Sequence, residues 1–134
     1  MKPVLRPILR FPRLWFCAGL VIAAVIAATS LVPSRDLPNL RFSDKLEHAL
    51  AYFVLAFWMA SVIVRRDFLM LGIVLLAFGG AIELAQGWMG LGRQADVMDL
   101  LADAAGIIVG VLLAMTPPGR WAEWLESLLF KRTA

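Results

Sequence analysis

Long uncharged, apolar stretches separated by short polar segments dominate the pattern of this chain. The clearest stretch runs from Leu14 to Val32 without a charged residue. An α-helix rises about 1.5 Å per residue, so roughly 20 apolar residues cross the hydrocarbon core of a bilayer. The stretch therefore predicts a first transmembrane helix over residues 14–32. We expect it to be retained as an anchor and not cleaved as a signal peptide, because further apolar stretches follow it.

Three more apolar stretches follow, and each is bounded by charged residues, proline or glycine. They predict spans over residues 48–64, 68–89 and 99–116. The last span stops at Pro117 and Pro118, because proline lacks the N–H that would continue the helix. Together the four stretches predict an all-α fold, a four-transmembrane-helix bundle that forms one domain over residues 14–116.

The segments on either side of the bundle are short and basic. Residues 1–13 form a basic N-terminal segment, and residues 117–134 form a C-terminal tail. In the tail, Trp121, Trp124 and Leu128 fall at helical spacing with charged residues between them. This pattern is typical of an amphipathic helix that lies in a membrane interface.

Lys and Arg are distributed unevenly between alternate connecting segments. The two terminal segments and the loop at Arg65 and Arg66 hold nine of the 13 basic residues, whereas the two remaining loops hold four. Loops with an excess of Lys and Arg stay in the cytoplasm. The count therefore predicts cytoplasmic termini in a multi-pass membrane protein, with a net charge of +6 inside and −3 outside.

Composition agrees with a membrane location and excludes several other classes of protein. Hydrophobic residues make up 61% of the chain, and the mean hydropathy is +0.80. The net charge of +3 comes from basic residues beside apolar stretches, so we expect the lipid bilayer as a partner and no nucleic acid. Cys17 is the single cysteine, which excludes an intrachain disulfide and a cysteine-based metal site.

Ionisable and polar residues form three groups within or beside the predicted spans. An ionisable group within a membrane requires a charged or hydrogen-bonding partner, a water-filled cavity or a functional role. The groups are Asp44, Lys45, His48 and Tyr52 at the second span, Glu83 and Gln86 in the third, and Asp96, Asp99 and Asp103 at the fourth. Spacings of three and four residues place each group on one helix face, and the predicted topology places all three groups at the outer leaflet.

We therefore expect these side chains, together with Arg93, to surround one polar pocket that water can reach. Three kinds of chemistry fit such a pocket: binding of a cationic or amide-bearing headgroup, metal coordination through histidine and carboxylates, and acid/base catalysis. The candidate catalytic residues are His48, Glu83 and Asp99. The residue pattern selects no particular metal or cofactor.

Each group also has a structural interpretation. Asp44 followed by Glu47 is typical of a helix N-cap and its reciprocal acid. Glu83 would form a buried ion pair with Arg93 or Lys45 and fix helix packing. Gly106 and Gly110 form a GxxxG spacing, which predicts a helix-packing face and gives no evidence of activity.

The polar residues follow one another in a fixed order and spacing. The pattern is Asp44-Lys45-x-x-His48-x-x-x-Tyr52, then Glu83-x-x-Gln86, then Arg93-x-x-Asp96-x-x-Asp99-x-x-x-Asp103-x-x-Gly106-x-x-x-Gly110. It resembles the VanZ-like family of small bacterial membrane proteins, from about Ser43 to Gly110, roughly half of the chain. At position 103 the family pattern usually has Asn, whereas this chain has Asp, which adds a negative charge.

The resemblance implies a multi-pass protein of the bacterial cytoplasmic membrane that belongs to the cell envelope. The family is named after an accessory protein of glycopeptide resistance, associated with reduced susceptibility to teicoplanin, a drug that targets cell-wall precursors outside the membrane. We therefore expect the outer pocket to recognise a lipid-linked or cell-wall-related headgroup and to affect glycopeptide susceptibility. Two alternatives stay open: a membrane-embedded acid/base or metal-assisted enzyme acting on an envelope lipid, and a non-catalytic structural or partner subunit, including a homo-oligomer.

Overall fold

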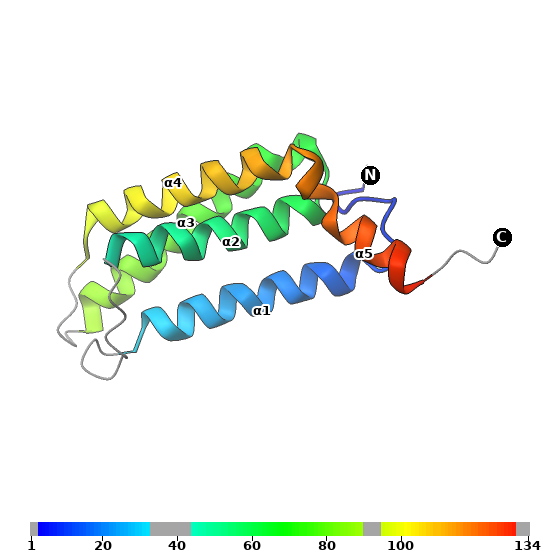
Figure 1. The fold of residues 1–134 in the computed structure, drawn as a ribbon. Helices are drawn as coiled ribbons and strands as arrows, with labels where there is room; N and C mark the ends of the chain where they lie inside the picture. Colours follow the sequence, from blue (N-terminus) through cyan, green and yellow to red (C-terminus); the bar gives the residue numbers. More distant parts are fainter. Residues whose placement is uncertain (1–2, 33–43, 90–94, 131–134) are drawn as a thin grey trace.

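Four long helices form a bundle in which consecutive helices run in opposite directions, so that the first is parallel to the third and the second to the fourth, and the described chain begins and ends at the same end of the bundle (Figure 1). The computed structural model describes residues 3–32, 44–89 and 95–130. The elements are α1 (Pro12–Ser30), α2 (Asp44–Val62), η2 (Arg65–Asp67), α3 (Phe68–Met89), α4 (Val97–Ala114), η3 (Pro117–Arg120) and α5 (Trp121–Leu129). We call the end with both termini the terminal end, and the opposite end, where α2 and α4 begin, the loop end.

The prediction of an all-α fold is confirmed for the described residues. Three helical segments are long and apolar enough to cross a membrane: Pro12–Ser30, Arg65–Met89 and Val97–Ala114. α2 is not among them, because its first turn contains Asp44, Lys45, Glu47 and His48. Three of the four expected spans thus support the prediction of a helical bundle that is embedded in a membrane.

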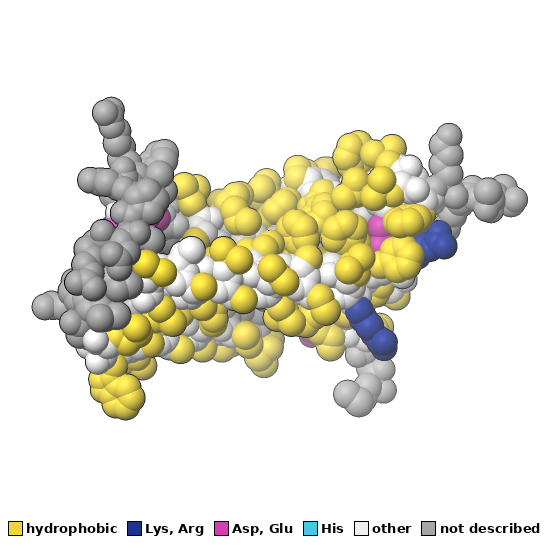
Figure 2. Space-filling model, turned by 90° about the horizontal axis from the view of Figure 1, so that it is seen from below, with side chains coloured by type: hydrophobic (Ala, Val, Ile, Leu, Met, Phe, Trp, Pro, Cys, Tyr) yellow, Lys and Arg dark blue, Asp and Glu magenta, His cyan; other side chains and the backbone are white. Residues whose placement is uncertain are grey.

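α2 lies at the centre of the bundle, where it contacts α1, α3 and α4. Its Leu55, Ala56 and Ala60 are fully buried at 0% exposure. Figure 2 shows apolar side chains over most of one face of the molecule, with the visible Lys and Arg near the terminal end. A broad exposed apolar surface of this kind fits a lipid environment better than water.

α2 and α4 approach each other closely at two glycines of α4. A Cβ atom on Gly106 would lie 2.2 Å from the carbonyl oxygen of Ala49, and one on Gly110 would lie 2.6 Å from that of Phe53. Both obstructing atoms belong to the α2 backbone and cannot rotate away. Small residues of this kind let two helix backbones approach in a membrane, and here they hold the polar residues of α2 against those of α4.

Glu126 of α5 caps the first turn of α1 at the terminal end. Phe11, the N-cap residue of α1, has no side-chain cap of its own. The Glu126 carboxylate instead accepts hydrogen bonds from the N–H of Arg10 at 2.6 Å, the N–H of Phe11 at 2.9 Å and the indole Nε1–H of Trp15 at 2.7 Å. A negative charge is stabilised at a helix N-terminus, so α5 fastens the first helix to the rest of the bundle.

This cap makes the stability of the fold depend on pH. Burial raises the pKa of Glu126, but the hydrogen bonds from Arg10, Trp15 and Phe11 outweigh it and lower the pKa below its ordinary value of 4.5. A depressed folded pKa stabilises the protein fully above about pH 4.5, and the stabilisation is lost as the pH falls through the folded value. We therefore expect the melting temperature in detergent to fall below about pH 4.5, and to fall less steeply for Glu126→Gln. Parallel curves for the two proteins would contradict this account.

Arg6 joins the N-terminal segment to the end of α2. Its guanidinium donates to the carbonyl oxygens of Ile63 at 3.1 Å and Ala60 at 3.3 Å, and it also reaches Gly119 and the Glu123 carboxylate. The last carbonyls of a helix have no intrahelical donor, so a cation there satisfies them. Arg6 therefore has a packing role that the count of basic residues did not predict.

Candidate functional site

Residues that were predicted to converge lie together at the loop end, between α2, α3 and α4. Lys45 of α2 donates from Nζ to Asp96 Oδ2 at 2.6 Å and to Asp99 Oδ1 at 2.5 Å. Asp96 is the N-cap of α4, and its Oδ1 accepts from the N–H of Met98 at 2.8 Å. One lysine thus ties the start of α2 to the start of α4.

His48 and Asp103 form the buried centre of this cluster. His48 Nδ1 lies 2.9 Å from Asp103 Oδ1, and the two side chains are 10% and 1% exposed. A carboxylate beside one ring nitrogen fixes the orientation of the imidazole and leaves the other nitrogen for a ligand or a proton. Asp103 is therefore the partner of the single histidine.

Tyr52 and the second oxygen of Asp103 face Gly79 of α3. A Cβ atom on Gly79 would lie 2.5 Å from Asp103 Oδ2 and 3.1 Å from the Tyr52 hydroxyl oxygen. Both oxygens are buried, and neither has a hydrogen-bond partner among the described residues. Gly79 makes room for these polar atoms, a role that sequence reasoning missed because glycine in an apolar helix gives no polar signal.

Glu83 and Gln86 connect α3 to its neighbours. Glu83 Oε2 accepts from the N–H of Asp96 at 3.0 Å, and Glu83 Oε1 is buried without a partner in the described part of the chain. Gln86 Nε2 donates to the carbonyl oxygen of Ser30, the last residue of α1, at 2.8 Å. Among the described residues Glu83 makes no ion pair, and Arg93, one of its expected partners, lies outside them.

The exposed edge of the cluster is formed by Asp44, Lys45 and Asp96. The side chains of Lys45 and Asp96 are 41% and 44% exposed. Hydrogen bonds from the Lys45 ammonium and from the N–H of Met98 lower the pKa of Asp96, which keeps this carboxylate ionised at neutral pH. Charged side chains therefore form the exposed edge of the cluster.

Acidic side chains outnumber cations at the loop end. The described acids there are Asp44, Glu47, Glu83, Asp96, Asp99 and Asp103, and the described cation is Lys45. Carboxylates gathered in one place repel one another unless a proton or a cation intervenes. The described part of the cluster is therefore suited to a positively charged ligand.

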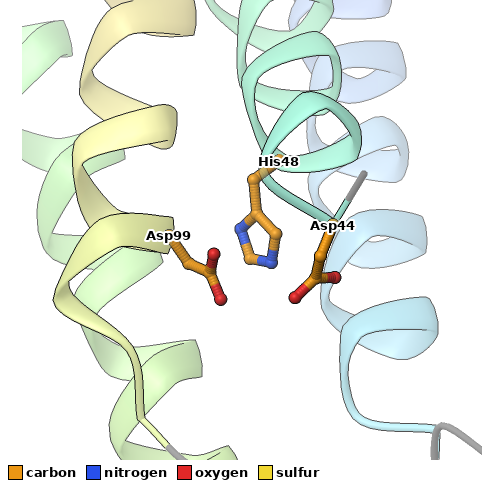
Figure 3. A group of neighbouring side chains, drawn as sticks. All are labelled: Asp44, His48 and Asp99. Atoms are coloured by element: carbon orange, nitrogen blue, oxygen red, sulfur yellow. The ribbon is translucent and has the colours of Figure 1, made fainter. Parts of the chain in front are cut away.

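One group within the cluster has the composition of a metal site. Asp44 and His48 on α2 and Asp99 on α4 each offer a ligand atom, and these atoms lie within 4.8 Å of one another. Figure 3 shows the imidazole ring between the two carboxylates. Histidine nitrogen with carboxylate oxygen suits divalent transition-metal ions.

Comparison with known proteins adds no relative to these observations. No family model matches the chain, and no curated protein or solved structure matches it. The loop-end residues and their contacts are therefore the basis for assigning a function.

Proposed function

We propose that the chain is a VanZ-like membrane protein of the bacterial cell envelope that binds an amine-bearing, lipid-linked or cell-wall-related headgroup at its loop end. In this proposal all four long helices cross the membrane. Both termini are cytoplasmic, α5 lies in the inner interface, and the loop end faces outward. One observation carries the proposal: three polar groups far apart in the sequence meet at one end of an apolar bundle.

The central position of α2 supports the fourth span. α2 contacts α1, α3 and α4, so protein covers much of its surface, although Leu46, Leu50 and Val54 on one face are 42%, 48% and 47% exposed. A helix shielded by protein tolerates a charged first turn, because Lys45 pairs with Asp96 and Asp99 of α4. The weaker hydrophobicity of α2 is therefore compatible with a membrane-crossing helix.

The charge of the loop end favours an amine over a phosphate as the recognised group. Asp99 is 6% exposed and Asp103 is 1% exposed, and a charge pair that excludes water is stronger than one in water. Asp44 and Asp96 lie at the exposed edge, where an incoming cation meets them first. A ligand amine would compete with Lys45 for Asp99, which makes the preference for a cation testable.

We expect the purified full chain in nanodiscs to bind a lipid-linked cell-wall precursor with a free amine at least about tenfold more tightly than its acetylated form, because acetylation removes the charge. Asp99→Asn should abolish this preference. Asp67→Asn, an acid of η2 at the terminal end, should retain it. Equal affinity of the wild type for the two precursors would overturn the proposal.

In a bacterial host that lacks the protein, the wild type should change teicoplanin susceptibility and Asp99→Asn should not.

A catalytic function is favoured by the buried pair of His48 and Asp103, because an oriented imidazole is a suitable general base. The same purified protein and the same precursors distinguish catalysis from binding. Mass spectrometry that finds a product with the wild type and none with His48→Gln would establish an enzyme. Recovery of unchanged precursor would leave headgroup binding as the function.

A further inference from the structure

We infer that Asp44, His48 and Asp99 bind a divalent transition-metal ion at the loop end (Figure 3). The ion would be held between α2 and α4, beside the salt bridges of Lys45. This inference goes beyond headgroup binding and stands or fails independently of it, because a metal titration needs no headgroup.

The first step is the geometry of the three ligand atoms. They lie within 4.8 Å of one another. Nitrogen and oxygen ligands lie about 2.0–2.2 Å from zinc, so two ligands of one ion are roughly 3–4 Å apart. Small side-chain rotations would bring ligand atoms that lie up to 4.8 Å apart to this separation. Asp44 can rotate in this way because its side chain is exposed on the first turn of α2.

The second step is the orientation of the His48 side chain. This observation does not depend on how many acidic residues lie nearby. Its side chain is only 10% exposed, and Nδ1 is already bound to Asp103. Nε2 has no hydrogen-bond partner among the described residues, and the ring lies between the carboxylates of Asp44 and Asp99 (Figure 3). A metal-binding histidine in proteins usually has its other ring nitrogen bound to a carboxylate or carbonyl. Asp103 occupies that position.

The third step is the choice of ion. One imidazole nitrogen and two carboxylate oxygens suit zinc or manganese, whereas calcium and magnesium prefer oxygen ligands alone. Three protein ligands leave at least one coordination position open. Lys45 contacts Oδ1 of Asp99 and leaves its other oxygen for the ion, but the ammonium charge opposes the ion. Removing that charge should therefore tighten metal binding.

The test is calorimetric titration of ZnCl2 into the full chain, purified in nanodiscs after treatment with a chelator. We expect one ion per chain. His48→Gln should weaken binding about a hundredfold, and Asp44→Asn and Asp99→Asn at least about tenfold, since each removes one of three ligands. Glu47→Gln is the matched control, because Glu47 is an acid in the same turn of α2 but outside the three ligands. Its affinity should stay within about threefold of the wild type, because Glu47 acts on the ion only through its charge and not as a ligand.

A second variant keeps the test decisive if His48→Gln fails to fold. Asp44 has an exposed side chain, so Asp44→Asn should keep the helical circular-dichroism spectrum of the wild type while losing affinity. Lys45→Met should bind zinc more tightly, roughly fivefold, an effect that partial unfolding cannot produce. Absence of saturable zinc binding to the wild type would overturn the inference. Equal zinc affinity of the wild type and Asp44→Asn would do so too.

Discussion

Gly106→Ala should lower the free energy of unfolding by about 2–3 kcal/mol, because the added methyl group overlaps backbone atoms of α2. The new Cβ would lie 2.2 Å from the Ala49 carbonyl oxygen and 2.9 Å from the Phe53 nitrogen. Neither atom can move without shifting the helix, so α2 and α4 must separate along their contact. Unfolding in detergent with increasing SDS, followed by tryptophan fluorescence, measures the loss.

Gly80→Ala is the matched control for this prediction. Gly80 also lies inside a helix, α3, but a Cβ atom there would have nothing within 4 Å. Alanine is a better helix former than glycine by up to about 1 kcal/mol, so this variant should be as stable as the wild type or more stable. If the two variants unfolded at the same SDS fraction, the close contact at Gly106 would not contribute to stability. Loss of that contact should also weaken zinc binding, because Asp99 would move away from His48.

Glu126→Ala should destabilise the fold by about 2–4 kcal/mol, because it removes three hydrogen bonds to a charged acceptor at once. The N–H groups of Arg10 and Phe11 and the Trp15 indole would lose their partner. These bonds are partly buried, and a partly buried donor left without an acceptor is unfavourable beyond the loss of the bond itself. A thermal melt in detergent near pH 7 measures the change, and Glu126→Gln should fall between the wild type and Glu126→Ala, since the amide keeps one acceptor oxygen.

Ser127→Ala is a suitable control for the α5 position. Ser127 is exposed, and its hydroxyl bonds only to the Trp124 carbonyl oxygen of the same helix. We expect its melting temperature to stay within the error of the wild type. A Glu126→Ala melt that coincided with that of Ser127→Ala would show that the cap is dispensable.

The helices were predictable from the sequence because the membrane requires long uncharged stretches. The prediction for the second span began at residue 48, however, whereas α2 begins at Asp44. Hydrophobicity marks the part of a helix that enters the apolar layer, while backbone hydrogen bonds continue into the charged turn outside it. The spacing of three and four residues likewise indicated the face of α4 that carries Asp96, Asp99 and Asp103.

The predicted topology indicated that the three polar groups would meet at one end of the bundle, but it did not indicate which side chains would pair there. Periodicity says which residues share a helix face but not which partner that face meets. Lys45 was an expected partner of Glu83, yet it pairs with Asp96 and Asp99. The cap formed by Glu126 was missed for the same reason, because it requires α5 to lie beside the start of α1.

That cap also bears on the order in which the chain assembles during synthesis. α1 is synthesised before α2, α3 and α4, but it buries only Gly19 and Ile26 and has no side-chain cap within its own segment. α2, α3 and α4 share the closer contacts, so they can associate while α1 is still a separate helix in the bilayer. Because α5 is synthesised after all four helices, α1 is held in place by a segment that is made later than the helices beside which it packs.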